Sequence, residues 1–191
     1  MTPTAEKPTK DRILGAAMAI THSEGARHLT IDAVTVKSGL SKGGVLYHFP
    51  SKKALLEGLI AHCLSQIRTR LDFHLAALSG SPNPTLRAMI CVFRDVLEGT
   101  VSLPVALLAA SAENPALLGP VRAEYGLLWQ SVKSETNNPT EAFLIWSALE
   151  GLYHFDVFDL APEGRSQLID CLIRLKTMAS EMPRKAGQNV I

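Results

Sequence analysis

The chain has 191 residues, of which 47% are apolar and 19% are charged. These proportions exclude a disordered chain and allow one large domain, or a small domain joined to a larger one, with a real hydrophobic core. The formal net charge is only +1, but residues 1–53 carry eight Lys and Arg against four Asp and Glu, and residues 54–191 carry eleven against fourteen. A basic segment joined to a mildly acidic body is expected when one end of a chain meets phosphate and the other does not.

The three cysteines, Cys63, Cys91 and Cys171, are widely spaced and form no CxxC pair. Their number and spacing argue against a disulfide scaffold or a zinc ribbon, so we interpret them as small buried hydrophobic residues, with a redox sensor as the alternative. The N-terminal segment is polar, and the most apolar run, residues 103–112, is too short to cross a bilayer. We therefore expect a cytoplasmic protein that makes no contact with a membrane.

Apolar residues recur at helical spacing along almost the whole chain, which predicts an all-α protein of about nine helices. The first helix spans about residues 10–23, with Ile13, Ala17 and Ile20 at positions i, i+4 and i+7. Gly25 is placed to end this helix in the left-handed conformation.

Two short helices follow. The second covers about residues 31–37, with Thr30 as its N-cap and Gly39 at its end, and the third begins after the N-cap Ser41 and ends near Phe49. A turn of about four residues joins them, which is typical of a helix-turn-helix whose second helix enters the major groove of DNA.

The rest of the chain forms a larger helical body. A long fourth helix starts at the N-cap Ser51 and reaches about residue 78, before a loop over residues 79–84. Further helices, separated by prolines, are predicted at residues 85–100, 105–113, 116–135, 141–158 and 163–182.

The third predicted helix carries two consecutive glycines, Gly43 and Gly44, each of which costs about 1 kcal/mol in a helix relative to alanine. A close approach of this helix to DNA would explain them; the alternative is that they belong to a loop. Lys42 could reach a phosphate or a guanine edge, and the Tyr47 hydroxyl a phosphate. His48 could do either, or be a surface residue without a role.

The stretch SKGGVLYHFPSKKAL over residues 41–55 resembles the signature of the TetR family of bacterial repressors, and RILGAA over residues 12–17 also matches. The resemblance covers about residues 7–67 and is specific, because several separated elements agree in order and spacing. It implies a three-helix, homeodomain-like DNA-binding domain in residues 1–53, with the motif at about 30–49, and a helical ligand-binding and dimerisation domain in residues 54–191.

The resemblance also implies which residues contact DNA. Many family members have a tyrosine where this chain has Leu46, so Leu46 is expected to meet a thymine methyl group or to pack inward. The implied DNA-binding residues are Thr30, Ser41, Lys42, Gly43, Gly44, Leu46, Tyr47, His48 and Lys52.

In the body, the helix predicted at 141–158 is apolar on nearly all sides and must be buried on several faces. The resemblance implies that this helix and the next pair with their copies in a dimer, through Ile145, Leu149, Leu152, Leu168, Leu172 and Leu175. It also implies a small-molecule pocket, for which the candidate lining residues are Phe93, Arg94, Tyr125, Trp129, Trp146, Glu150 and His154. Glu150 and His154 share a helix face and could orient a ligand or hold a metal, but an intrahelical pair or a dimer contact is the favoured interpretation.

These observations predict a homodimeric regulator that binds a palindromic double-stranded DNA operator, represses transcription and is released by a small-molecule effector. An enzyme is disfavoured because the chain contains no GxSxG, HExxH, P-loop or dinucleotide fingerprint. No catalytic residue, metal ligand or cofactor is therefore predicted. The second alternative is a helical ligand-binding or protein-interaction module without DNA binding, against which the intact stretch from Ser41 to Lys53 argues.

Overall fold

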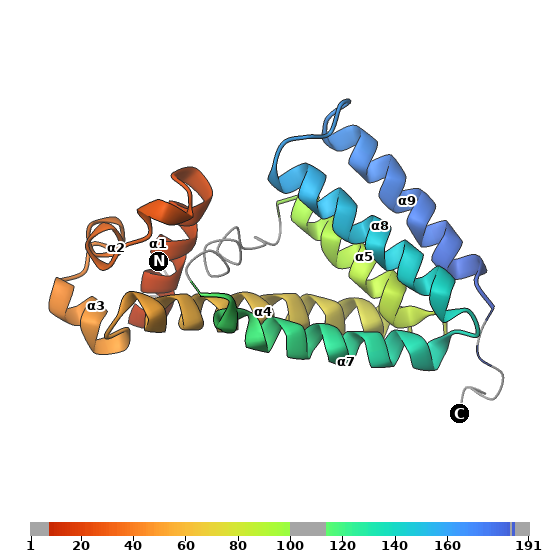
Figure 1. Cartoon of the computed structure of the whole chain (residues 1–191), viewed down its shortest axis with the longest axis horizontal. Coiled ribbons are helices and arrows are strands. Elements are labelled where there is room, and N and C mark those ends of the chain that lie inside the picture. The colour runs from red at the N-terminus through yellow and green to blue at the C-terminus, as the bar shows by residue number, and fades with distance from the viewer. Residues whose placement is uncertain (1–7, 100–113, 184, 186–191) are drawn as a thin grey trace, which may run out of the picture. The chain divides into compact units, whose positions relative to one another are not determined.

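The structure is a computed structural model that describes residues 8–99, 114–183 and 185. Within these residues the regular structure is helical, which confirms the predicted all-α class. None of the described helices combines the length and the apolar character needed to cross a bilayer. The predicted helix at 105–113 lies outside the described residues. The elements, shown in Figure 1, are α1 (Thr9–Ser23), the 3₁₀ turn η1 (Ala26–His28), α2 (Ile31–Ser38), α3 (Lys42–His48), α4 (Lys52–Ala77), α5 (Pro84–Leu97), the 3₁₀ turn η2 (Pro115–Leu118), α7 (Gly119–Glu135), α8 (Pro139–Val157) and α9 (Arg165–Glu181).

The helix ends are fixed by the predicted capping residues. The side chains of Thr30 and Ser41 each accept a hydrogen bond from the backbone N–H three residues further on, at 3.0 and 3.1 Å. Asn138 does the same for α8 at 3.2 Å. Gly39 closes α2 with φ of 66°, a left-handed conformation that costs glycine nothing.

The described residues form two compact units, each with its own core. The head unit comprises residues 8–65 and 114–122, and the body unit comprises residues 66–99 and 123–185. Helices α4 and α7 contribute residues to both units.

The core of the head unit is aliphatic and draws on α1 to α4 and on η2. The Arg12 guanidinium donates to the Ser38 carbonyl oxygen at 3.1 Å and so ties α1 to the end of α2. Residues of this core with at most 6% of their surface exposed include Ile13, Ala17, Ile20, Leu29, Val34, Val45, Leu55, Leu59 and Leu117.

The core of the body unit lies among α5, α7, α8 and α9, of which α5, α8 and α9 run side by side in Figure 1. The buried residues of α8, Ala142, Ile145, Trp146 and Leu149, follow a single stripe, whereas Phe143 and Leu144 are exposed. The prediction that this helix is buried on several faces is therefore wrong for the described protomer. Core members include Leu86, Ile90, Phe93, Val132, Ile145, Trp146, Leu149, Leu168, Leu172 and Leu175.

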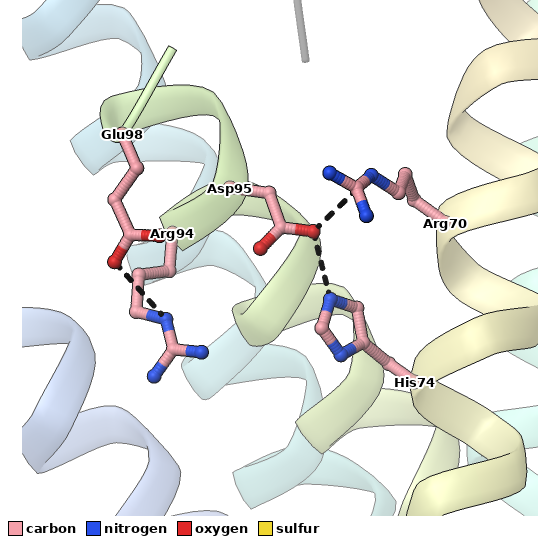
Figure 2. Close-up of polar contacts among 5 residues, drawn as sticks. All are labelled: Arg70, His74, Arg94, Asp95 and Glu98. Carbon is pink, nitrogen blue, oxygen red and sulfur yellow. Dashed lines mark hydrogen bonds and ion pairs between the residues drawn. The ribbon is translucent and has the colours of Figure 1, made fainter. Parts of the chain in front are cut away.

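A buried carboxylate links α4 to α5 within the body unit (Figure 2). Asp95 Oδ2 lies 2.8 Å from His74 Nε2 and 3.6 Å from Arg70 Nε, both on α4. The neighbouring Arg94 is exposed and pairs instead with Glu98, one turn along α5, at 3.6 Å. Asp95 is therefore the polar anchor that holds the second half of α4 against α5.

Candidate functional site

The candidate DNA-contacting surface is the open face of α3. Val45 is fully buried and fixes α3 on the head core, whereas Lys42 and Tyr47 project outward, Tyr47 with 85% of its surface exposed. Thr30 and Ser41, at the starts of α2 and α3, are exposed as well, although their hydroxyl oxygens accept capping hydrogen bonds. The motif thus presents cationic, aromatic and hydroxyl groups to the outside while one aliphatic residue anchors α3.

The two glycines lie inside α3, so the alternative that they form a loop is wrong. A Cβ atom at Gly43 would meet nothing within 4 Å, so no contact within the described protein requires glycine there. A Cβ atom at Gly44 would lie 3.3 Å from Ser41 Oγ, which is tighter than most such contacts. Gly44 therefore has an internal explanation in the N-cap, and Gly43 does not.

Lys42 forms an ion pair that the sequence analysis missed. Its Nζ lies 2.7 Å from Asp32 Oδ1, in the first turn of α2, and both side chains are largely exposed. Asp32 is an acidic residue on a motif expected to meet phosphate, and it lies two residues after the predicted contact Thr30. This position in the sequence could have indicated the ion pair with Lys42. The positive charge of Lys42 is shared with a carboxylate before any DNA is bound.

The remaining predicted contacts are less exposed. Leu46 and His48 are half-buried, and the His48 ring lies edge-on to Tyr47 with ring centroids 5.2 Å apart. Lys52 is half-buried and already takes part in an interaction within the protein.

A glycine in α4 fixes the C-terminal end of α3. The buried Phe49 ring lies so close to α4 that a Cβ atom at Gly58 would be 2.4 Å from Phe49 Cε1. Gly58 therefore makes room for the ring that ends α3. The signal in the sequence was a glycine inside a long helix, where it is otherwise unfavourable.

In the body unit the structure brings together four of the seven predicted pocket residues. Tyr125 Oη and Trp146 Nε1 both donate to Glu150 Oε1, each at 2.9 Å. The Trp129 and Trp146 ring centroids are 5.8 Å apart, and those of Tyr125 and Trp146 are 5.6 Å apart. Phe143, not predicted as a lining residue, extends the group at 5.4 Å from Trp129. We call Tyr125, Trp129, Phe143 and Trp146 the aromatic cluster.

Burial and the adjacent Glu150 carboxylate hold the pKa of the Tyr125 phenol well above its usual range. The phenol therefore keeps its proton and remains a hydrogen-bond donor to Glu150 at physiological pH.

The other predicted pocket residues lie elsewhere. Phe93 is buried with its ring against Tyr153, at 6.0 Å between centroids, and Arg94 pairs with Glu98. His154 is exposed, and its Nδ1 lies 2.7 Å from the backbone oxygen of Glu150, not from the carboxylate. Among the described residues, no three His, Cys, Asp or Glu side chains come together as metal ligands.

Five of the six predicted dimer residues are buried in the core of their own protomer, and Leu152 is half-buried. The five lie inward and are not available at the surface of the described protomer; they are Ile145, Leu149, Leu168, Leu172 and Leu175. The exposed large apolar side chains on α8 and α9 are Phe143, Leu144, Phe155 and Ile173, and the exposed Phe158 follows directly after α8. A helix that is apolar on every side does not reveal from its sequence which stripe faces inward.

A separate pocket of about 420 Å³ lies in the head unit, and none of the predicted effector residues lines it. Its lining residues are Lys53, Glu57, Ile60, Ala61, Asn114, Ala116, Leu117 and Pro120.

Two family profiles match the chain. The profile described as "Bacterial regulatory proteins, tetR family" matches residues 13–59, and "Tetracyclin repressor-like, C-terminal domain" matches residues 83–177. The HTH-type transcriptional regulator TtgW of Pseudomonas putida, itself described as uncharacterized, is 33% identical over 67 residues, 35% of this chain and 48% of TtgW. The regulator BetI of Yersinia pestis is 28% identical over 81 residues, 42% of this chain and 41% of BetI. The chain thus spans less than half the length of these relatives.

Solved structures share the fold over most of their length. A transcriptional regulator from Rhodococcus sp. Rha1 has a TM-score of 0.69 at 19% identity, covering 90% of this chain and 96% of that one. A TetR regulator from Haloarcula marismortui also reaches 0.69, at 15% identity over 93% and 98%. The multidrug binding protein EbrR complexed with malachite green reaches 0.67, at 21% identity over 91% and 98%.

Proposed function

This chain belongs to the TetR family of bacterial transcription regulators, and on that premise we propose that it represses transcription by binding a palindromic operator as a homodimer, and that a small-molecule effector releases it. The relatives that it matches are transcription regulators and not enzymes.

The open face of α3 carries this proposal. Lys42 and Tyr47 are exposed on a helix that is held to the core through Val45, and Gly43 removes a side chain where the protein itself would tolerate one. A surface that is flattened by glycine and flanked by a cation and a phenol suits a duplex groove, in which charge binds the backbone and side-chain edges read bases.

A homodimer follows from the way such motifs read DNA. Two recognition helices must sit about 34–36 Å apart to occupy successive turns of one palindrome. The exposed apolar residues Leu144, Phe155 and Ile173 on α8 and α9 are the proposed contacts.

Release by an effector follows from linkage. An effector weakens DNA binding if it binds more tightly to the dimer when the spacing of the two head units does not fit DNA. The size of the effect is set by the difference between the effector's affinities for that arrangement and for the DNA-binding one. A hundredfold release needs about 2.7 kcal/mol of coupling. Helix α4 is the proposed lever, because it contributes residues to both units and is tied to α5 through Asp95.

The test is genome-wide mapping of the DNA that the protein binds, followed by fluorescence anisotropy on a recovered site. We expect a palindromic site, a protein dimer on it and weaker binding by a Tyr47→Ala variant. Failure to retard any DNA at low salt would support the alternative of an interaction module without DNA binding.

A further inference from the structure

Two members of the aromatic cluster, Tyr125 and Trp146, contact a carboxylate that has no cationic partner in the described part of the chain. Both hydrogen bonds to the Glu150 carboxylate, from Tyr125 and Trp146, go to the same oxygen, Oε1, and both come from neutral groups. The ion pairs of the described residues join other carboxylates, such as Asp95 and Asp156. The described residues donate no hydrogen bond to the second oxygen of Glu150, Oε2, so this oxygen is available to an external partner.

The rings around Glu150 are open on one side. Trp146 is buried and Trp129 half-buried, but Tyr125 and Phe143 have 43% and 56% of their surfaces exposed. If the only task were to join α7 to α8, two exposed aromatic rings would add nothing that smaller residues could not supply. Such rings offer apolar faces with negative electrostatic potential to an external group.

We infer that the aromatic cluster and Glu150 bind an organic cation, a quaternary or aryl ammonium with an apolar body. Glu150 supplies the counter-charge, and the accessible faces of Tyr125, Trp129 and Phe143 supply cation–π and apolar contact. A quaternary ammonium has no N–H to donate, so Oε1 can keep its two hydrogen bonds while the cation approaches Oε2. The binding site stands by itself; only its role as the effector site rests on the proposed function.

The chemistry of the cluster selects against other ligands. An anion would be repelled by Glu150. A neutral ligand of the same shape would have to remain beside an uncompensated carboxylate, which it would partly desolvate. The raised pKa of the Tyr125 phenol keeps that group protonated near neutral pH, so it adds no negative charge of its own to the cluster.

The chain reports on this site directly, because its only two tryptophans, Trp129 and Trp146, both lie in the cluster. The full-length protein is titrated with phenyltrimethylammonium and, separately, with tert-butylbenzene, its uncharged isostere. Tryptophan fluorescence follows binding, and equilibrium dialysis measures it independently of any optical change. We expect saturable binding of the cation at least tenfold tighter than that of the neutral compound.

The decisive variant is Glu150→Gln, which keeps an oxygen acceptor for Tyr125 and Trp146 and removes the charge. It should weaken the cation at least tenfold and leave the neutral compound unchanged. Glu181→Gln, which removes a charge from an exposed position of α9, should bind the cation like the wild type. Phe143→Ala, at an exposed position, should lose affinity several-fold. Thermal unfolding followed by circular dichroism establishes that each variant is folded.

Equal affinities of wild type and Glu150→Gln for the cation would overturn the inference, as would equal affinities of the wild type for the two probes or no binding in dialysis. No DNA is present in this assay. A cation that binds through Glu150 but does not change DNA affinity would therefore refute the effector part of the proposed function and leave the binding site in place.

Discussion

Both units cap helices locally, but the body unit relies more on side-chain hydrogen bonds that join helices far apart in the chain. In the head unit, the bond from Arg12 to Ser38 is of this kind. Thr30 and Ser41 each cap a helix by bonding to a residue three positions away. In the body, the Asn83 amide donates to the carbonyl oxygens of Ala179 and Met182, at 2.9 and 3.1 Å, and so closes the end of α9.

The head and body units also differ in how many polar side chains they bury. Among the described residues, the head unit buries one polar side chain, Thr21, and the body unit buries four: Asn83, Thr85, Asp95 and Thr136. A core held by local caps and aliphatic packing leaves its polar groups free for the surface. A core held by buried polar ties depends on each tie having its partner, because an unpaired buried polar group is costly.

The substitution with the largest expected effect on this contrast is Asp95→Ala. The variant leaves the half-buried His74 without its acceptor and Arg70 without its carboxylate, so the free energy of unfolding of the body should fall by about 2–3 kcal/mol. Urea unfolding followed by circular dichroism measures this. Glu98→Ala, which breaks the exposed pair with Arg94, should change it by less than about 1 kcal/mol. Equal losses would mean that burial of the Asp95 pair contributes nothing.

Gly58→Ala probes the tightest packing in the head. The new methyl group would displace the Phe49 ring, and overpacking of this kind costs about 1–3 kcal/mol. Gly15→Ala on α1 is the control, because its Cβ would meet nothing within 4 Å; it should stabilise the head by about 0.5–1 kcal/mol. If both substitutions stabilise, the Phe49 ring is not held as the structure has it.

Tyr47→Ala should weaken operator binding about tenfold, equivalent to roughly 1.4 kcal/mol, and leave stability unchanged because the side chain is exposed. Anisotropy on the mapped operator gives the affinity. Phe73→Ala is the control. Phe73 is also an exposed aromatic residue but lies on α4, and this variant should bind DNA like the wild type. A loss of stability in Tyr47→Ala would point to a packing role instead.

Asp32→Asn should strengthen DNA binding about threefold at low salt, because it removes a negative charge and frees the charge of Lys42 for phosphate. The gain should shrink as salt is added. Asp11→Asn, which removes an exposed charge from α1, should gain less. Weaker binding by Asp32→Asn would show instead that Asp32 positions Lys42 or contacts a base.

The smallest effect concerns Glu135, whose carboxylate accepts hydrogen bonds from the Thr85 backbone and hydroxyl. Burial raises its pKa, although the bonds from Thr85 oppose the shift. Because the folded-state pKa is above the unfolded one, its contribution to stability is fully present below the unfolded pKa and is lost as pH rises through the folded pKa. Unfolding curves at several pH values should show a weaker decline in Glu135→Gln than in the wild type. An unchanged pH dependence would contradict this.

The same contrast explains what the sequence could predict. Caps and turns such as Thr30, Gly39 and Ser41 depend on neighbours within a few residues, and the structure confirms them. The tie between Asp95 and His74 spans 21 residues and has no local signal. The inward stripe of α8 was misassigned because the helix is apolar on every side. The DNA contacts rest on family resemblance and stay predictions.

The hydrogen bonds of Asn83 also limit when the body unit can complete its fold during synthesis. The last turn of α9 is closed by a residue made 96 to 99 positions earlier. While the chain emerges from the ribosome, the bonds of Asn83 cannot form until Ala179 and Met182 have left the exit tunnel, and the apolar residues of α5 and α8 that pack against α9 stay uncovered until α9 has been made. A chain that is truncated before that point exposes an aliphatic surface on its body unit. Chaperones and proteases recognise such surfaces.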